Sequence, residues 1–156
     1  MGWNTRLLLY HNYVHNDLYE AGNTKAYDYG VRAFYERESR RHSWKAGFDF
    51  ERYGGSFYVN EGMDFLTSSP QYDHNAAPYL LGRYDLDPRF SVSGGLRVNF
   101  ADRYDTELVP QARLLAQLDD ASALTLSAAR GFKTPSIAEQ YLFFFNRDGE
   151  TLEPER

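Results

Sequence analysis

Cysteine is absent from the 156 residues. This absence excludes disulfide bonds and metal sites built on thiolates. No apolar run approaches the roughly 18 residues that a membrane-crossing helix requires. Hydropathy windows do not detect the strands of a membrane barrel, because apolar and polar side chains alternate along them, so that fold stays open.

Basic residues are too few and too scattered for a nucleic-acid surface. Lys and Arg number 17 against 22 Asp and Glu, which gives a formal net charge of −5. Proteins that bind nucleic acid gather Lys and Arg on one face or along one helix. We therefore expect no nucleic-acid partner.

The N-terminus has no secretory signal peptide. Its apolar run spans only residues 7–10, and polar residues follow at once. A signal peptide needs a longer apolar stretch. If the mature protein is exported, its signal lies outside this sequence, which is then a fragment of a longer chain.

The motifs of common enzyme classes are missing as well. The sequence has no GxSxG, Walker loop, HExxH or dinucleotide-binding fingerprint, so we predict no enzyme, no catalytic residues and no cofactor. His11 and His15 lie four residues apart, with Asp17 and Glu20 nearby. That spacing suits zinc on a helix, but on a strand it separates the two histidines by about 13 Å, so we predict no metal site.

Aromatic residues are abundant in a chain that is polar on average. They make up 17% of the residues, with 13 Tyr and 11 Phe, while the mean hydropathy is −0.63. A membrane barrel combines these properties, because half of each strand faces water or a polar lumen and the loops are polar.

The segment 90–100 carries the clearest strand pattern. Phe90, Val92, Leu96, Val98 and Phe100 share one face, and polar residues occupy the other. A transmembrane β-strand needs about 9–11 residues, apolar outward and polar inward, with aromatic residues at both membrane interfaces. The pattern fits such a strand, but a half-buried strand of a soluble sandwich also alternates, so one strand does not decide between them.

Similar alternation recurs along the chain and predicts seven strands. They are 3–14, 26–36, 43–52, 77–86, 90–100, 107–118 and 123–132. The facing of 3–14 is ambiguous, because both of its faces carry apolar residues. Pro110 cannot donate to a ladder, so we expect it at the start of its strand or at a bulge.

Short and long connections alternate between these strands. The short turns are 37–42, 87–89 and 119–122, and the longer connections are 15–25, 53–76, 101–106 and 133 onward. Outer-membrane barrels have short periplasmic turns and longer extracellular loops. This arrangement places a mostly aromatic girdle at each interface. The residues near the inner interface are Tyr35, Trp44, Leu86 and Phe90, and those near the outer one are Tyr27, Phe50, Phe100 and Phe132.

The predicted lipid faces of the second to sixth strands hold no Asp, Glu, Lys or Arg. A basic residue at mid-membrane costs about 2–4 kcal/mol, which explains this avoidance. Arg130 in the seventh strand is the exception, and we expect its head to reach polar lipid groups near the outer end.

The second half of the sequence resembles a known family. The run ARGFKTPSIAEQY at 129–141 and the run LEPE at 152–155 resemble the barrel of TonB-dependent outer-membrane receptors. The resemblance implies that residues 1–156 are part of a barrel domain, without the plug and the remaining strands. Seven strands are about a third of a barrel of roughly 22.

The resemblance also implies a function and a location. Such receptors import scarce nutrients across the Gram-negative outer membrane, for example siderophore-bound iron, haem, cobalamin or oligosaccharides. The implied partners are outer-membrane lipid, an N-terminal plug domain, a periplasm-spanning energy-transducing protein of the TonB type and a small nutrient ligand. The fold class is then all-β, an antiparallel up-and-down transmembrane barrel segment with long loops on one side.

Candidate ligand-binding residues lie in the aromatic-rich connection over 53–76. They are Phe57, Tyr58, Phe65, Tyr72 and His74. Rings of this kind stack on a flat ligand such as haem or a catecholate, or alternatively pack the loop against itself. The sequence does not name the ligand.

The charged residues of the predicted lumen face have two interpretations. They contact a plug or substrate, or they pair across strands in a polar interior. They are Arg32, Asp49, Glu51, Arg83, Asp85, Arg97 and Arg113. For the whole chain, the alternative to a receptor is a soluble β-sandwich or a small surface barrel with a binding or adhesion role, because half-buried strands alternate too.

Overall fold

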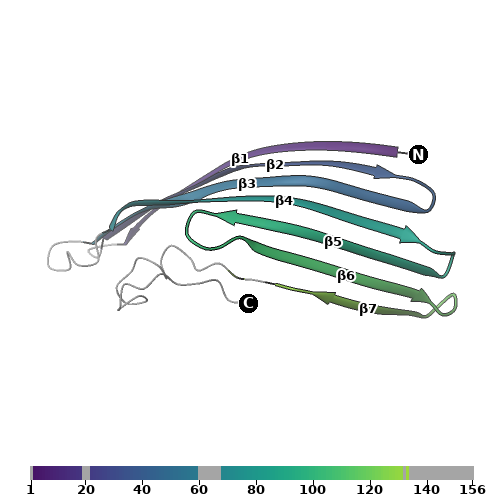
Figure 1. The fold of residues 1–156 in the computed structure, drawn as a ribbon. Coiled ribbons are helices and arrows are strands. Elements are labelled where there is room, and N and C mark those ends of the chain that lie inside the picture. Colours follow the sequence, from purple (N-terminus) through teal and green to yellow (C-terminus); the bar gives the residue numbers. More distant parts are fainter. Residues whose placement is uncertain (1, 19–21, 60–67, 132, 134–156) are drawn as a thin grey trace.

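The computed structural model describes residues 2–18, 22–59, 68–131 and 133. Seven strands make up the described chain (Figure 1). They are β1 (Gly2–Leu18), β2 (Gly22–Glu38), β3 (His42–Val59), β4 (Ser68–Asp85), β5 (Phe90–Ala101), β6 (Glu107–Gln117) and β7 (Ala123–Ala129).

The strands form one curved antiparallel sheet in the order β1-β2-β3-β4-β5-β6-β7 (Figure 1). Each strand pairs with its neighbours in the sequence, which confirms the predicted all-β, up-and-down arrangement. Among the described strands, β1 and β7 lie at two open edges. No helix in the described ranges is long and apolar enough to cross a membrane.

The strand register places apolar residues beside apolar residues on neighbouring strands. One cross-strand row runs Leu9, Val31, Phe50, Ala76 and Phe100 from β1 to β5. Because neighbours across a sheet share a face, this row defines an apolar face and leaves the alternate residues on a polar face. Pairing with β2 also resolves the facing of β1, because Leu7 and Leu9 lie opposite Ala33 and Val31 on the apolar face.

The apolar face is uncovered. Leu7, Leu9 and Leu126 expose 66%, 68% and 68% of their surface, and Ala77 and Ala116 are the buried hydrophobic residues among those described. A soluble sandwich would bury this face against a second sheet about 10 Å away. The described strands form a single sheet, so the arrangement is that of a barrel wall rather than a sandwich.

The first four strands are longer than the sequence predicts, so the predicted loop over 53–76 is wrong. β3 and β4 stay paired to Gly55 and Gln71, and a β-bulge lies between Gly55 and Phe57. The glycines that suggested a loop lie at close strand contacts, since a Cβ on Gly54 would meet the carbonyl of Gln71 and one on Gly55 that of Lys25. The predicted connection 15–25 likewise shortens, because β1 ends at Leu18 and β2 begins at Gly22.

Strand lengths differ across the sheet. β4 begins at Ser68, but its pairing with β5 begins only at Asn75 and Ala101. β1–β4 therefore extend beyond the end of β5 (Figure 1).

Pro110 lies inside β6 opposite Leu96, neither at the first residue nor at a bulge as expected. Its carbonyl accepts the N–H of Arg130 at 3.0 Å, just beyond the end of β7. In an antiparallel strand, the N–H and C=O of one residue point to the same neighbouring strand. The N–H that Pro110 lacks would therefore point toward β7, at the end of the β6–β7 ladder. β7 ends at Ala129 instead of 132, and Phe132 lies outside the described residues.

Candidate functional site

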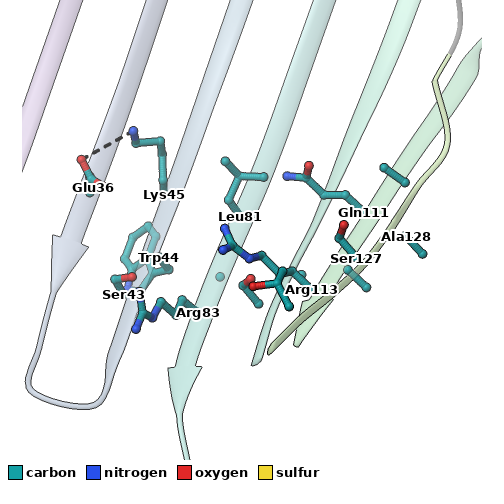
Figure 2. Close-up of a pocket in the computed structure, with 16 residues that line it drawn as sticks. Glu36, Ser43, Trp44, Lys45, Leu81, Arg83, Gln111, Arg113, Ser127 and Ala128 are labelled. Carbon is teal, nitrogen blue, oxygen red and sulfur yellow. Dashed lines mark ion pairs between the residues drawn. The ribbon is translucent and has the colours of Figure 1, made fainter. Parts of the chain in front are cut away.

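The polar face of the sheet is hollowed near the short turns. A cavity of about 600 Å³ lies over β2–β7, and side chains of the polar face form most of its lining (Figure 2). Lys45 pairs with Glu36 at 3.6 Å on its rim, while Gln111 and Arg113 project from β6 (Figure 2). The surface offers hydrogen-bond donors and acceptors rather than an apolar pocket.

Charged residues of the same face pair with one another, between strands or within one strand. Arg97 Nη1 lies 2.6 Å from Asp49 Oδ2, and Arg97 Nε donates to Asn99 Oδ1 at 3.0 Å. Arg83 Nε lies 2.9 Å from Asp85 Oδ1. These four predicted lumen charges are therefore paired, Arg97 with Asp49 between two strands as the cross-strand interpretation expects, and Arg83 with Asp85 within β4.

Other predicted lumen charges have different neighbours. Arg32 stacks over the ring of Tyr10 at 5.3 Å, and Tyr10 in turn covers Gly30 opposite it. Tyr79 covers Gly47 in the same way on β3 and β4. The sequence analysis did not identify this tyrosine–glycine packing, although a Tyr opposite a Gly becomes recognisable once the register is known.

A second polar cluster closes the outer end of the polar face. Asp73 is 5% exposed and pairs with Arg103, and Glu107 is 3% exposed. Arg130 Nη2 lies 2.8 Å from Glu107 Oε2, so this arginine turns to a protein carboxylate and not to lipid head groups as expected. The change follows from the end of β7 at Ala129, beyond which Arg130 no longer follows the strand alternation.

Two side-chain amide atoms near this cluster have no hydrogen-bond partner among the described residues. They are Asn75 Oδ1 and Asn99 Nδ2, both buried. One is an acceptor and the other a donor on adjacent strands, where diagonal neighbours lie roughly 7–8 Å apart. A polar group bound between them, such as a water molecule, would satisfy both.

The predicted ligand-binding residues divide between the two longest strands. Phe57 and Tyr58 lie on β3, Tyr72 and His74 lie on β4, and Phe65 lies outside the described residues. His74 lies opposite Arg52 and Tyr72 opposite Gly54, on the extension of the apolar face. The ring of His74 packs 6.3 Å from that of Phe50, and its Nδ1 lies 2.5 Å from Asp102 Oδ2.

The two histidines of β1 belong to no group of potential metal ligands in the described part of the chain. His15 Nε2 lies 3.0 Å from Asp17 Oδ1. The ring of His11 packs 6.4 Å from those of Tyr27 and Tyr29. Among the described residues, no three His, Cys, Asp or Glu side chains gather at one point.

Comparison with known proteins identifies the family. A family model described as "TonB dependent receptor-like, beta-barrel" matches residues 2–156. No curated protein and no solved structure matches the chain. The match covers nearly the whole sequence, and the single antiparallel sheet of seven strands is consistent with a segment of such a barrel. The chain therefore belongs to the TonB-dependent receptor-like β-barrel family.

Proposed function

We propose that the chain forms part of the barrel wall of a receptor that imports a scarce nutrient across the Gram-negative outer membrane. The height of the apolar face carries the proposal. Ten residues of β3 separate the row of His42 and Tyr84 from the row of Arg52 and His74. At about 3.4 Å per residue and a tilt of about 45°, that distance spans roughly 25 Å, the height of the apolar band of a membrane barrel.

The polar face then lines the interior of the barrel. The paired charges on it, among them Arg97 and Asp49, form a hydrophilic wall against which a plug domain packs. Energy for import comes from a periplasm-spanning protein of the TonB type. The nutrient is a siderophore-bound iron, haem, cobalamin or an oligosaccharide.

The outer parts of β3 and β4 extend above the apolar band, where both faces of the sheet meet the outside. We propose that Phe57, Tyr58 and Phe65 contact the nutrient, whereas Tyr72 and His74 lie beside Arg52 on the extension of the apolar face and support this rim from outside. The support is the aromatic character of these residues and the extension of β3 beyond the row of Arg52 and His74. Flat or aromatic nutrients are the ligands best suited to such a rim.

A growth experiment tests this function. A strain that lacks the full-length gene is supplied with iron–siderophore, haem, cobalamin or an oligosaccharide as the limiting source. We expect loss of growth on one source and recovery when the gene is restored. Recovery must also fail in cells without the TonB-type partner. Normal growth of the deletion strain on every source, with no difference in labelled uptake, would contradict the proposal.

A further inference from the structure

The cross-strand row directly above the apolar band is polar and aromatic instead of apolar. It runs His11, Tyr29, Arg52 and His74 across β1–β4, one alternation beyond Leu9, Val31, Phe50 and Ala76. From this row we infer that Arg52 binds the phosphate of an outer-leaflet lipid head group on the outer wall of the barrel. The inference rests on the proposed function, because it requires the apolar face to lie in the membrane.

Arg52 is held in a fixed pose by two tyrosines. Its Nη1 donates to the hydroxyl of Tyr29 at 2.8 Å. The guanidinium carbon lies 4.6 Å from the ring centre of Tyr72 and 5.8 Å from that of Tyr29. The guanidinium is planar and held in place by these contacts, and such a group favours a two-point contact with an anion.

The charge of Arg52 has no counter-ion in the described part of the chain. No carboxylate there forms an ion pair with it, and its Nε is buried without a hydrogen-bond partner. Two carboxylates lie near this face, but Asp17 pairs with His15 and Asp102 pairs with His74. A half-buried cation beside an apolar surface is costly unless an anion compensates it, so the anion must come from outside these residues.

Lipid is the occupant that fits this position. Tyrosine rings favour the level of the head groups, and the apolar band ends one row below Arg52. Lys25 lies on the same face further out, exposed, and forms no ion pair in the described residues. Two uncompensated cations at the outer end of a lipid-facing wall match a phosphate-bearing head group.

A titration of the full-length receptor in detergent tests the inference. The probes are lipid A, which carries phosphates, the same lipid after enzymatic dephosphorylation, and inorganic phosphate. Binding is measured by native mass spectrometry. We expect lipid A to bind and Arg52→Gln to weaken that binding about tenfold, as the loss of a hydrogen bond to a charged group predicts. Arg52→Lys keeps the charge without the fork and should lose less.

Arg113→Gln is the matched control, because Arg113 lies on the polar face and forms no ion pair in the described residues. It should leave lipid binding unchanged. Equal binding of lipid A by the wild type and Arg52→Gln would overturn the inference. Equal binding of the dephosphorylated lipid, or binding of inorganic phosphate as tight as that of lipid A, would overturn it as well. If Arg52→Gln does not fold, Arg52→Lys and Lys25→Gln provide the same comparison.

The two proposals fail separately. A receptor that imports a nutrient but binds lipid A independently of Arg52 overturns this inference alone. A protein that binds lipid A through Arg52 but supports growth on no tested source overturns only the proposed transport.

Discussion

At the scale of single residues, Arg97 connects three strands through one side chain. It reaches Asp49 on β3 at 2.6 Å and lies over the ring of Tyr79 on β4 at 6.0 Å, while itself belonging to β5. Its Nε holds Asn99 Oδ1. A guanidinium shared in this way ties the middle of the sheet together on its polar side.

Replacing Arg97 should weaken the fold measurably. We expect Arg97→Gln to lower the free energy of unfolding of the full-length receptor by about 1–2 kcal/mol, because a charge-assisted hydrogen bond is lost and Asp49 loses its partner. Urea unfolding in lipid vesicles measures the change, with Arg40→Gln in an exposed turn as the control. A double-mutant cycle with Asp49→Asn that gives no coupling energy would contradict this expectation.

A second residue-scale prediction concerns pH. The N–H of Ala121 donates to Asp119 Oδ1 at 2.8 Å in the β6–β7 turn, and this bond, with a weaker one from Ser122, holds the pKa of Asp119 below its ordinary value of 3.8. A lowered pKa in the folded state means that the stabilising contribution is present above pH 3.8 and is lost as the pH falls through the folded pKa.

Asp119→Asn isolates this contribution. The mutant should be less stable than the wild type at neutral pH, and the difference should shrink as the pH falls below about 4. Unfolding midpoints measured across that range test the point. A difference that stays constant with pH would show that the carboxylate charge of Asp119 does not stabilise the turn.

At the scale of elements, the strands depend on glycines at crowded positions. A Cβ on Gly30 would meet the carbonyl of Phe50 and lie 2.8 Å from the Tyr10 hydroxyl, whereas one on Gly82 would meet nothing within 4 Å. Backbone atoms in a sheet cannot yield as a flexible side chain does. The two glycines therefore differ in what a side chain would cost.

Gly30→Ala should destabilise the receptor by about 1–3 kcal/mol through overpacking. Gly82→Ala is the matched control and should be neutral or stabilising by up to about 1 kcal/mol, since it only restricts the unfolded chain. Unfolding of both variants under identical conditions measures the contrast. Similar stabilities for the two variants would contradict the packing at Gly30.

The sequence analysis predicted the strands best where one face meets apolar surroundings. In β5 the alternation of residues 90–100 located the strand to within one residue of its end at Ala101. In β3 the prediction stopped at 52, because beyond Arg52 both faces are polar or aromatic and alternation has no physical cause. Gly54 and Gly55 then looked like a loop, and only the strand register reveals their role.

The candidate site was predictable in kind but not in detail. Tyr72 and His74 stood out as aromatic residues, yet their contacts with Arg52 and Asp102 depend on partners distant in the sequence. Arg130 was misjudged for the same reason, since its partner Glu107 lies on another strand. Side-chain pairing across strands needs the register, which local patterns do not supply.

At the scale of the whole molecule, the sheet has an uncovered apolar face and a hydrophilic one. Leu80, Leu96 and Leu114 expose 56%, 44% and 40% of their surface on the apolar face. Such a surface is stable only against lipid or another apolar partner.

Fractionation of cells that express the full-length protein tests this conclusion. We expect the protein in the outer-membrane fraction, and faster gel migration without heating than after boiling, because folded barrels resist detergent. Both properties should persist in Gly82→Ala, where a Cβ meets nothing within 4 Å. Recovery from the cytosol with no change in mobility on heating would contradict the membrane assignment.

The unequal heights of β4 and β5 have a consequence for access. β4 begins at Ser68 but pairs with β5 only from Asn75, so β1–β4 extend further at this end of the sheet than β5 does. In a barrel oriented as we propose, the part of the wall formed by β1–β4 would reach further outward than the part that begins at β5, so a nutrient from outside would meet β1–β4 first.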